Sequence, residues 1–403
     1  MIGRIRAGPR QTPTAILLRS QRRILICCEY FLPGFKAGGP IRSIDNLVQW
    51  LGGEFQYWIY TRDRDLGDTE SYAGIVPDRW IEREGLRIFY ASPGNVLRGL
   101  SVSLRTCNPS LIYLNSVFAP FTVFLLAQRR RGMISGQKIL IAPRGEFNPG
   151  AMSLKTWKKN IYLSIARAAG LFRGVSFHAT SSSELDEVRR MLGDQVSVRL
   201  AVNLGPRDSI IPRRDSSLKV PGSVKLVFCS RVVPKKNLHF LVETLKGLRG
   251  SVQLNIIGPK EDLEYTRKIE ALQKSLPASV RVNWEGVVQP NRIGERLGAN
   301  HFFVLPTLGE NYGHAIVEAW AAGLPVLISD RTPWRGLDSL RCGWDLSLED
   351  VGAWRSTLQG CIDMSETEYG PMHRAAFVQA DRLHTAPPLE DWRSLFEWAA
   401  LTG

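Results

Sequence analysis

The 403-residue chain lacks the features that define several special classes of protein. No window reaches the roughly 18 uninterrupted apolar residues that a membrane-spanning helix needs. The six cysteines form no CxxC pair and no spaced framework, which argues against a disulfide-rich secreted domain and favours reduced, buried thiols in a cytoplasmic protein. No internal repeat or low-complexity tract is visible. With 44% hydrophobic and 22% charged residues, the composition is that of a globular protein.

Acidic residues are scarce relative to basic ones, and the formal net charge is +14. A phosphate-rich ligand, an anionic membrane or a nucleic acid would each complement such a charge, and the charge alone does not choose among them. The first 23 residues carry six arginines and no acid. This composition resembles a transit peptide, but a solvated, unstructured tail over residues 1–22 is the favoured interpretation.

Short apolar runs alternate with helical stretches in both halves of the chain. Runs that are apolar on both faces suit parallel strands covered by helices on each side, so the pattern predicts doubly wound α/β sheets. The predicted strands are 24–28, 57–60, 87–91, 111–115, 138–142 and 175–179 in the first half, and 225–230, 254–258, 301–305 and 325–329 in the second.

The length fits two domains of roughly 200 residues each. Gly205, Pro206 and Pro212 interrupt the periodic pattern and mark the boundary. We therefore expect two Rossmann-like domains facing each other across a cleft, one over 23–205 and the other over 206–385. The last segment, 386–403, is expected to form a helix that can pack back on the first domain.

The most informative segment runs from Leu308 to Ser329, between a predicted strand and the next one. Gly309 and Gly313 allow the backbone to approach a ligand where a helix begins, near Asn311 or Tyr312, and unpaired N–H groups there suit a phosphate. Two glutamates, at 310 and 318, place one carboxylate beside the cleft and the other along the helix. That spacing alone is weak evidence, and two unrelated surface acids would produce it too. The whole 22-residue block is more specific.

This block resembles the nucleotide-sugar signature of retaining glycosyltransferases of the GT-B fold, family four. The resemblance implies that Glu310 is catalytic and lies near the donor sugar, and that Glu318 binds the ribose hydroxyls. It also implies that the backbone of Asn311, Tyr312 and Gly313 holds the donor, that 206–385 is the nucleotide-sugar domain and that 23–205 is the acceptor-side domain. Among the histidines, His314 is the one expected near the donor.

A second block, Ser230 to Asn237, follows a predicted strand directly. Arg231 offers a planar fork and Lys236 a mobile point charge, and both can converge on one diphosphate. The resemblance assigns both residues to that diphosphate, with Lys235 one position out of register and Asn237 where the family usually has glycine. An exposed basic turn is the alternative.

The first half offers a glycine pair, Gly38-Gly39, between the first strand and a helix expected to begin near residue 41 or 42. It is similar to the family's N-terminal glycine loop, which approaches the donor phosphates and the acceptor. A dinucleotide-binding fold would also place glycines here, but the G-x-G-x-x-G spacing is missing, which disfavours an NAD site.

The acceptor side is expected to involve Asn115, Arg144 and Glu146, which follow predicted strands. Asn115 stands where many relatives carry a histidine. Asparagine can hydrogen-bond a sugar but cannot serve as a general base, so front-side displacement assisted by the leaving phosphate fits better. An Arg144–Glu146 pair that merely fixes the loop is an equal alternative.

Two further segments have competing interpretations. Trp157 and the basic residues of 153–170 can rest on an anionic membrane that carries a lipid-linked acceptor, although a plain solvated face is favoured. Asp63 and Asp65 form a D-x-D, the metal motif of the other glycosyltransferase fold. Nothing near them supports a metal cage, so no metal and no cofactor are expected. His178 and His239 are expected to be packing or cap residues.

The sequence thus predicts a cytoplasmic glycosyltransferase, peripheral on the membrane at most, that moves a sugar from a nucleoside-diphosphate donor to a glycan or lipid-linked hydroxyl acceptor with retention. The resemblance implies a role in bacterial surface polysaccharide synthesis, without a nucleic-acid partner. Two alternatives stay open: a basic nucleic-acid- or membrane-binding non-enzyme, and a GT-B nucleotide-sugar epimerase.

Overall fold

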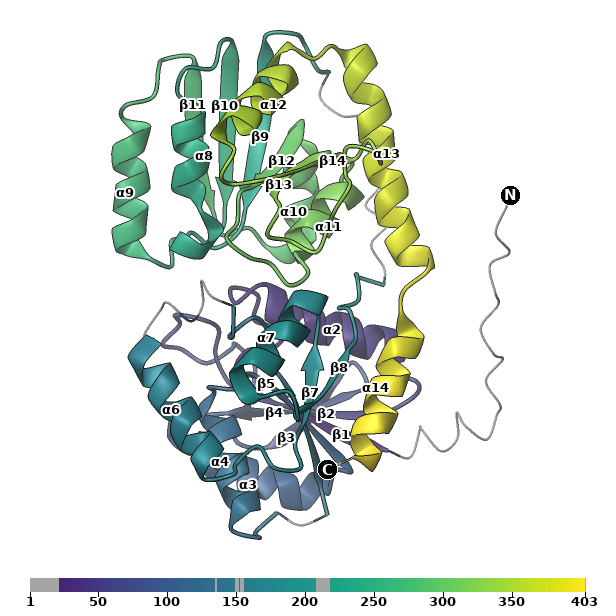
Figure 1. Ribbon diagram of the computed structural model, residues 1–403. Coiled ribbons are helices and arrows are strands. Elements are labelled where there is room, and N and C mark those ends of the chain that lie inside the picture. Colours follow the sequence, from purple (N-terminus) through teal and green to yellow (C-terminus); the bar gives the residue numbers. More distant parts are fainter. Residues whose placement is uncertain (1–21, 135, 149–151, 153–155, 208–217, 403) are drawn as a thin grey trace, which may run out of the picture.

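The computed structural model describes residues 22–134, 136–148, 152, 156–207 and 218–402. The chain forms two α/β domains, one above the other in Figure 1, with a cleft between them. This confirms the predicted fold class. Almost all of the predicted basic tail lies outside the described residues. Within those residues, no helix is both long enough and apolar enough to cross a membrane.

The N-terminal sheet has eight strands in the order β3-β4-β2-β1-β5-β6-β7-β8, parallel except for the β3–β4 pair. Its strands are β1 (Arg23–Cys27), β2 (Gln56–Arg62), β3 (Trp80–Arg83), β4 (Leu86–Ala91), β5 (Leu111–Asn115), β6 (Lys138–Ala142), β7 (Ser176–Ala179) and β8 (Ser197–Leu200).

The C-terminal sheet has six parallel strands in the order β11-β10-β9-β12-β13-β14. Its strands are β9 (Ser223–Cys229), β10 (Ser251–Ile257), β11 (Val280–Gly286), β12 (Phe302–Leu305), β13 (Val326–Ser329) and β14 (Gly343–Leu346). A single buried apolar cluster surrounds this sheet.

Helices cover both faces of each sheet. The N-terminal domain contains η1 (Pro93–Asn95), α2 (Gly39–Leu51), α3 (Val96–Cys107), α4 (Pro120–Arg130), α6 (Thr156–Ala168) and α7 (Ser182–Leu192). The C-terminal half contributes η2 (Pro234–Lys236), α8 (Leu238–Thr244), α9 (Leu263–Gln273), α10 (Pro290–Gly298), α11 (His314–Ala321), α12 (Val351–Asp363), α13 (Glu366–Thr385) and α14 (Leu389–Leu401).

Successive residues of strand β1 point to opposite sides of the N-terminal sheet. Ile24 and Ile26 belong to the apolar cluster beneath α2 and α14, whereas Leu25 and Cys27 belong to the cluster beneath α3, α4 and α6. A parallel strand buried on both faces is apolar at most of its positions, which explains why such strands were visible in the sequence. All six cysteines are buried and unpaired.

The last helix, α14, returns to the N-terminal domain after α13 has packed against α11 of the other domain (Figure 1). Trp392, Leu395 and Phe396 are buried against the first sheet, and Arg393 forms two bonds of 2.6 and 2.8 Å with Glu54. The chain therefore ties the two domains together at the side of the cleft as well as at the linker.

The structure contains all ten predicted strands and four that the sequence analysis missed: β3, β8, β11 and β14. Each of the four is the outermost strand of its sheet. An edge strand is covered less completely, and its side chains are mostly half-buried or exposed. It therefore lacks the continuous apolar run on which the prediction relied.

Replacing Trp392 by alanine should destabilise the N-terminal domain although the residue lies near the other end of the chain. Its side chain is fully buried, so the loss should be about 3–5 kcal/mol in the free energy of unfolding. Urea denaturation measures this change. The matched variant Trp157→Ala removes a tryptophan that is 64% exposed and should change stability by less than about 0.5 kcal/mol. Equal losses in the two variants would contradict the packing of α14 described above.

Candidate functional site

A cavity of about 300 Å³ lies between the two domains. Its wall is built by the loops that follow β1, β6, β7 and β8 in the first sheet and β9, β10, β11 and β12 in the second. In open parallel sheets, ligands bind at the carboxyl ends of the strands, and here two such edges face each other.

The cavity wall is strongly basic. Two helices, α2 and α11, begin at it, and neither has a side-chain cap or an acidic residue in its first turn. Their uncapped N–H groups and dipoles add positive potential to that of the side chains. The basic lining residues are Lys36, Arg42, Arg144, Arg231, Lys235 and Lys236, and the acidic ones are Glu310 and Glu318.

Both helices are preceded by a glycine in a left-handed backbone conformation. Gly38 has φ 70° and Gly313 has φ 79°, a region that side chains with a Cβ rarely adopt. A Cβ on Gly38 would meet no atom within 4 Å, so its backbone faces open space in the cleft. Because Gly313 turns the chain, α11 begins at His314, two or three residues later than predicted.

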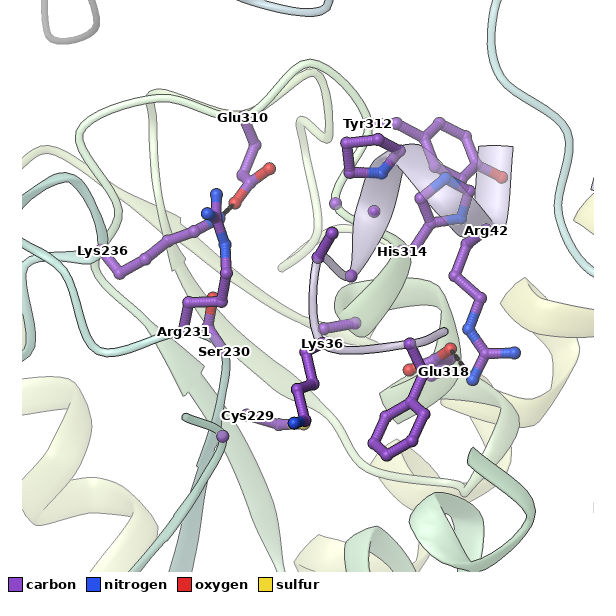
Figure 2. Close-up of a pocket in the computed structure, with 18 of the residues that line it drawn as sticks. Lys36, Arg42, Cys229, Ser230, Arg231, Lys236, Glu310, Tyr312, His314 and Glu318 are labelled. Carbon is purple, nitrogen blue, oxygen red and sulfur yellow. Dashed lines mark hydrogen bonds and ion pairs between the residues drawn. The ribbon is translucent and has the colours of Figure 1, made fainter. Parts of the chain in front are cut away.

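Glu310 and Lys236 meet directly and form an ion pair within the cavity wall (Figure 2). The loops that carry them are also joined through the backbone, because the Leu308 N–H donates to the carbonyl of Lys235 over 2.8 Å. The structure thus brings together one acid and one cation that lie 74 positions apart in the sequence.

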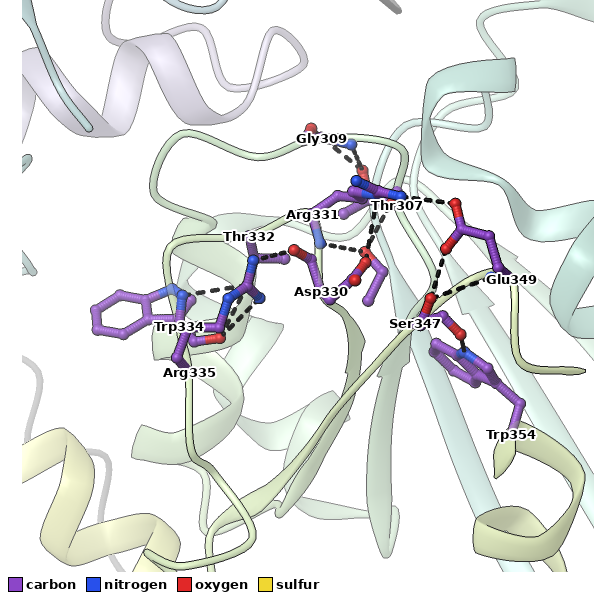
Figure 3. Close-up of polar contacts among 11 residues, drawn as sticks. Thr307, Gly309, Asp330, Arg331, Thr332, Trp334, Arg335, Ser347, Glu349 and Trp354 are labelled. Carbon is purple, nitrogen blue, oxygen red and sulfur yellow. Dashed lines mark hydrogen bonds and ion pairs between the residues drawn. The ribbon is translucent and has the colours of Figure 1, made fainter. Parts of the chain in front are cut away.

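The loop that carries Glu310 rests on the ends of neighbouring strands. The Glu310 N–H donates to the Arg331 carbonyl over 2.9 Å, and the Ser329 hydroxyl donates to the Thr307 carbonyl. Arg331 is in turn held by Glu349 at 2.6 Å (Figure 3). These contacts hold the Glu310 loop through residues that do not line the cavity.

Glu318 lies on the opposite side of the cavity, where Arg42 of α2 pairs with it over 3.4 Å (Figure 2). Burial raises the pKa of Glu318, and the charge of Arg42 opposes that rise. One turn earlier on α11, the His314 Nε2 contacts the Ser43 hydroxyl at 2.8 Å. Both contacts join the two domains, so the first turn of α2 docks onto α11.

Arg231 lines the cavity but pairs with Glu261 at 2.9 Å, and both side chains are about one-third exposed. A pair in such a setting contributes little to stability and exchanges readily for a ligand. Lys235 also lines the cavity, and within the described ranges no acid forms an ion pair with it. Burial lowers the pKa of Lys235, and the nearby carboxylate of Glu310 opposes that effect.

The D-x-D segment supports the glycine loop. Asp65 accepts hydrogen bonds from the backbone N–H groups of Phe35 at 2.7 Å and of Lys36 at 3.0 Å, which lie just before Gly38. Asp63 is buried and accepts from the guanidinium of Arg64. The residues that the structure describes contain no group of three or more histidines, cysteines and acids that could hold a metal ion.

Arg144 reaches the cavity from the end of β6. Its guanidinium donates to Asn115 at 2.8 and 3.0 Å, to Asn203 at 2.7 Å and to the Tyr113 hydroxyl at 3.0 Å. All of these partners are neutral, so the positive charge is oriented without being offset. Asn115 does not line the cavity itself and acts on Arg144 instead.

Glu146 occupies a different place from the one expected. It does not line the cavity and forms no pair with Arg144. Its carboxylate accepts 2.6 Å hydrogen bonds from the Ser116 hydroxyl and from the Val117 N–H. Burial raises the pKa of Glu146 to about 7. The prediction that Glu146 contacts an acceptor is therefore corrected. In the structure, Glu146 holds the loop after β5.

Sequence reasoning missed several residues of this wall, namely Lys36, Arg42, Ser43, Thr180 and Asn203. Thr180 accepts a hydrogen bond of 3.2 Å from the Asn311 side chain across the cleft. Arg42 and Ser43 lie in the first turn of the helix after the glycine pair. That position in the sequence could have predicted that they line the cavity. The other three are ordinary polar residues whose place depends on how the domains meet.

Comparison with known proteins identifies a family over part of the chain. Residues 211–336 match the family model "Glycosyl transferases group 1". The curated lipopolysaccharide core biosynthesis glycosyltransferase LpsE of Rhizobium meliloti is 29% identical over 137 residues. That match covers 34% of this chain and 38% of the relative's length.

Solved structures extend the likeness in fold to nearly the whole chain. Sucrose-phosphate synthase from Thermosynechococcus elongatus superposes with a TM-score of 0.67 at 17% identity, over 94% of this chain and 100% of that one. Anabaena HepE, in complex with UDP and glucose, gives 0.66 at 14% identity, over 93% and 98%. The predicted resemblance to group 1 glycosyltransferases of the GT-B fold is confirmed. That the sugar is transferred with retention of its anomeric configuration stays a prediction.

Two buried histidines should make stability depend on pH. Burial lowers the pKa values of His314 and His178 to about 3, well below the usual 6.5, and nearby arginine charges add to this effect. The unfolded chain therefore binds protons from pH 6.5 downward while the folded one does not, so stability is full above 6.5 and falls as the pH drops. At pH 5.5 each imidazole should cost up to about 1.4 kcal/mol.

Thermal unfolding at pH 7.5 and 5.5 measures this loss, and His314→Gln should show less of it than the wild type. If the variant and the wild type lose stability equally on acidification, the assigned neutral state of His314 is wrong.

Proposed function

We propose that this chain, a GT-B-fold protein of the group 1 glycosyltransferases, transfers a sugar from a nucleoside-diphosphate donor to a hydroxyl acceptor with retention of configuration. One observation carries the proposal. The turn with Arg231 and Lys236 and the turn with Glu310, Asn311 and Gly313 line the same basic cavity between the domains.

The donor diphosphate would bind between Arg231 and Lys236, with the uncapped starts of α2 and α11 directed at its oxygens. Both cations now pair with carboxylates, Glu261 and Glu310, and a diphosphate would replace those partners. Lys235, which has no ion pair within the described part of the chain, adds a third charge beside them. Because cations and helix N-termini offset the phosphate charge, we propose that no metal is required.

The ribose of the nucleotide would hydrogen-bond to Glu318. Its carboxylate now forms an ion pair with Arg42, and two ribose hydroxyls can take the place of that guanidinium. The backbone at Gly38 and Gly39 faces the same space and would approach the phosphates closely. Tyr312 is buried in the loop wall, so its contribution would come from the backbone.

Glu310 would lie beside the donor sugar, held there by its backbone bond to Arg331. In the transfer step, the bond between the anomeric carbon and the phosphate oxygen breaks, and a bond from the acceptor oxygen forms on the same face. The acceptor proton passes to the departing diphosphate. Lys236 and Arg231 stabilise the charge that develops on that leaving group. Asn115 carries no basic nitrogen, which suits a mechanism without a protein base on the acceptor side.

The sugar acceptor would enter beside Arg144, whose charge no acid offsets among the described residues. The partial match to a lipopolysaccharide core glycosyltransferase supports a glycan or lipid-linked acceptor in surface polysaccharide synthesis. The UDP and glucose in the Anabaena structure make UDP-sugars the first donors to test.

Removing the cations of the second block should weaken binding of the diphosphate selectively. Arg231→Ala and Lys236→Ala should each lower the affinity for UDP by about 10- to 100-fold, as expected for hydrogen bonds to a charged group. Affinity for uridine should change little. Calorimetric titration measures both. The control Lys274→Ala removes an exposed lysine of the same domain and should leave UDP affinity unchanged. Equal weakening toward UDP and uridine would rule out a diphosphate role for these residues.

Removing the acid near the sugar should affect turnover rather than binding. Glu310→Gln should reduce nucleoside-diphosphate release from the productive donor by at least about 100-fold, measured in the presence of EDTA across UDP-, GDP- and ADP-sugars. The control Glu264→Gln changes an exposed acid on α9 and should keep full turnover. Undiminished turnover in Glu310→Gln would contradict the catalytic role of Glu310, and a wild-type protein that turns over none of these donors would favour a non-catalytic function. A requirement for added metal would contradict the metal-independent proposal.

A further inference from the structure

One stretch of the N-terminal domain is almost free of acids. Between Glu84 and Glu184 the sequence contains 13 basic residues and a single acid, Glu146. That acid is hydrogen-bonded to the backbone and side chain of its own domain, as described above. The stretch therefore accounts for most of the net charge of +14, and only one of its basic residues, Arg144, lines the cavity between the domains.

The same stretch forms the helices α3, α4 and α6, which cover one face of the first sheet (Figure 1). The long helix α6 carries apolar side chains on two sides. Leu163 and Ala166 are buried against the domain. Trp157, Ile161 and Ile165, spaced by four residues, form an outward row with exposed fractions of 64%, 49% and 61%.

Basic residues surround this row. Lys158 lies on α6 with its ammonium 5.3 Å from the ring of Trp157, and Arg167 follows at the end of the helix. Arg130 and Arg131 end α4, where Met133 is 70% exposed. In the described ranges none of these four cations forms an ion pair, so their charge faces solvent without compensation. The nearest acids in sequence are Glu146, which is hydrogen-bonded within its own domain, and Glu184, Asp186 and Glu187 on α7, of which only Asp186 is exposed.

We propose that this face, centred on α6 and the end of α4, binds the surface of an anionic lipid bilayer. An exposed apolar row flanked by lysine and arginine is the pattern of an interfacial helix: the apolar side chains enter the boundary of the acyl chains, and the cations meet the headgroups. A nucleic acid would use the cations but would leave the isoleucines in water, so the apolar row favours a membrane.

The face is connected to the acceptor side of the cleft. The Tyr162 hydroxyl of α6 donates to the carbonyl of Val117 at 3.4 Å, just after the end of β5. Asn115, at that strand end, holds Arg144 in the cavity wall. Docking through α6 would therefore hold the bilayer beside the entrance through which a lipid-linked acceptor reaches the cavity.

Vesicle sedimentation with the full chain tests this surface. Binding should be weak to phosphatidylcholine vesicles and at least tenfold stronger when about 30% of the lipid is phosphatidylglycerol, because each basic residue near an anionic surface contributes about fivefold. Two patch variants should each lose at least tenfold. One carries Trp157→Ser, Ile161→Ser and Ile165→Ser; the other carries Arg131→Glu, Lys158→Glu and Arg167→Glu.

Matched control variants change equally exposed residues of the C-terminal domain and should bind like the wild type. They are Leu263→Ser with Val351→Ser and Val378→Ser, and Arg267→Glu with Lys268→Glu and Lys274→Glu. Melting temperatures show whether a patch variant has unfolded. If the apolar variant is unfolded, the result of the charge variant decides the test.

Three outcomes would overturn the proposal: no binding to anionic vesicles, equal losses in patch and control variants, or binding of a fluorescent oligonucleotide through the same cations with no vesicle binding. The assay contains no sugar donor. A failure here therefore leaves the proposed transfer reaction standing, and a failure of the transfer reaction does not affect this result.

Discussion

Positive charge concentrated at the cleft is the constraint on which the rest of the structure depends. Six basic side chains and the uncapped starts of α2 and α11 share one cavity with two acids. Such a wall has an electrostatic cost unless anions offset it. The two acids each hold one cation in place, Glu310 with Lys236 and Glu318 with Arg42. A ligand with two phosphates and vicinal hydroxyls complements both pairs at once.

The fold creates this constraint in a simple way. Parallel strands deliver every loop that follows them to the same edge of the sheet, and the two sheets turn those edges toward each other. The supporting contacts lie one layer behind the cavity, where Asp65 fixes the loop before Gly38 and Arg331 fixes Glu310. Because α14 leaves the C-terminal domain and packs on the first sheet, the spacing of the two edges is tied to a buried apolar contact.

Much of this arrangement could be predicted because it depends on local patterns. Central strands are apolar at most positions, and glycines mark the helix starts at 38 and 313. The edge strands could not be found in this way, since one side of each is only partly covered. The partner of Glu318 was also missed. That Arg42 faces Glu318 depends on how the two domains meet, which no local pattern encodes. The position of Glu146 after a strand predicted that it would lie in the cleft. Its carboxylate instead accepts hydrogen bonds from the loop that follows β5.

The central claim is that one nucleoside diphosphate occupies the cleft and contacts both blocks of the C-terminal domain. A crystal structure of the protein with UDP tests this most directly. The account predicts phosphate oxygens within hydrogen-bond distance of Arg231 and Lys236, and ribose hydroxyls on the carboxylate of Glu318. A nucleotide bound outside the cleft, or one whose phosphates point away from the 230–237 turn, would contradict it.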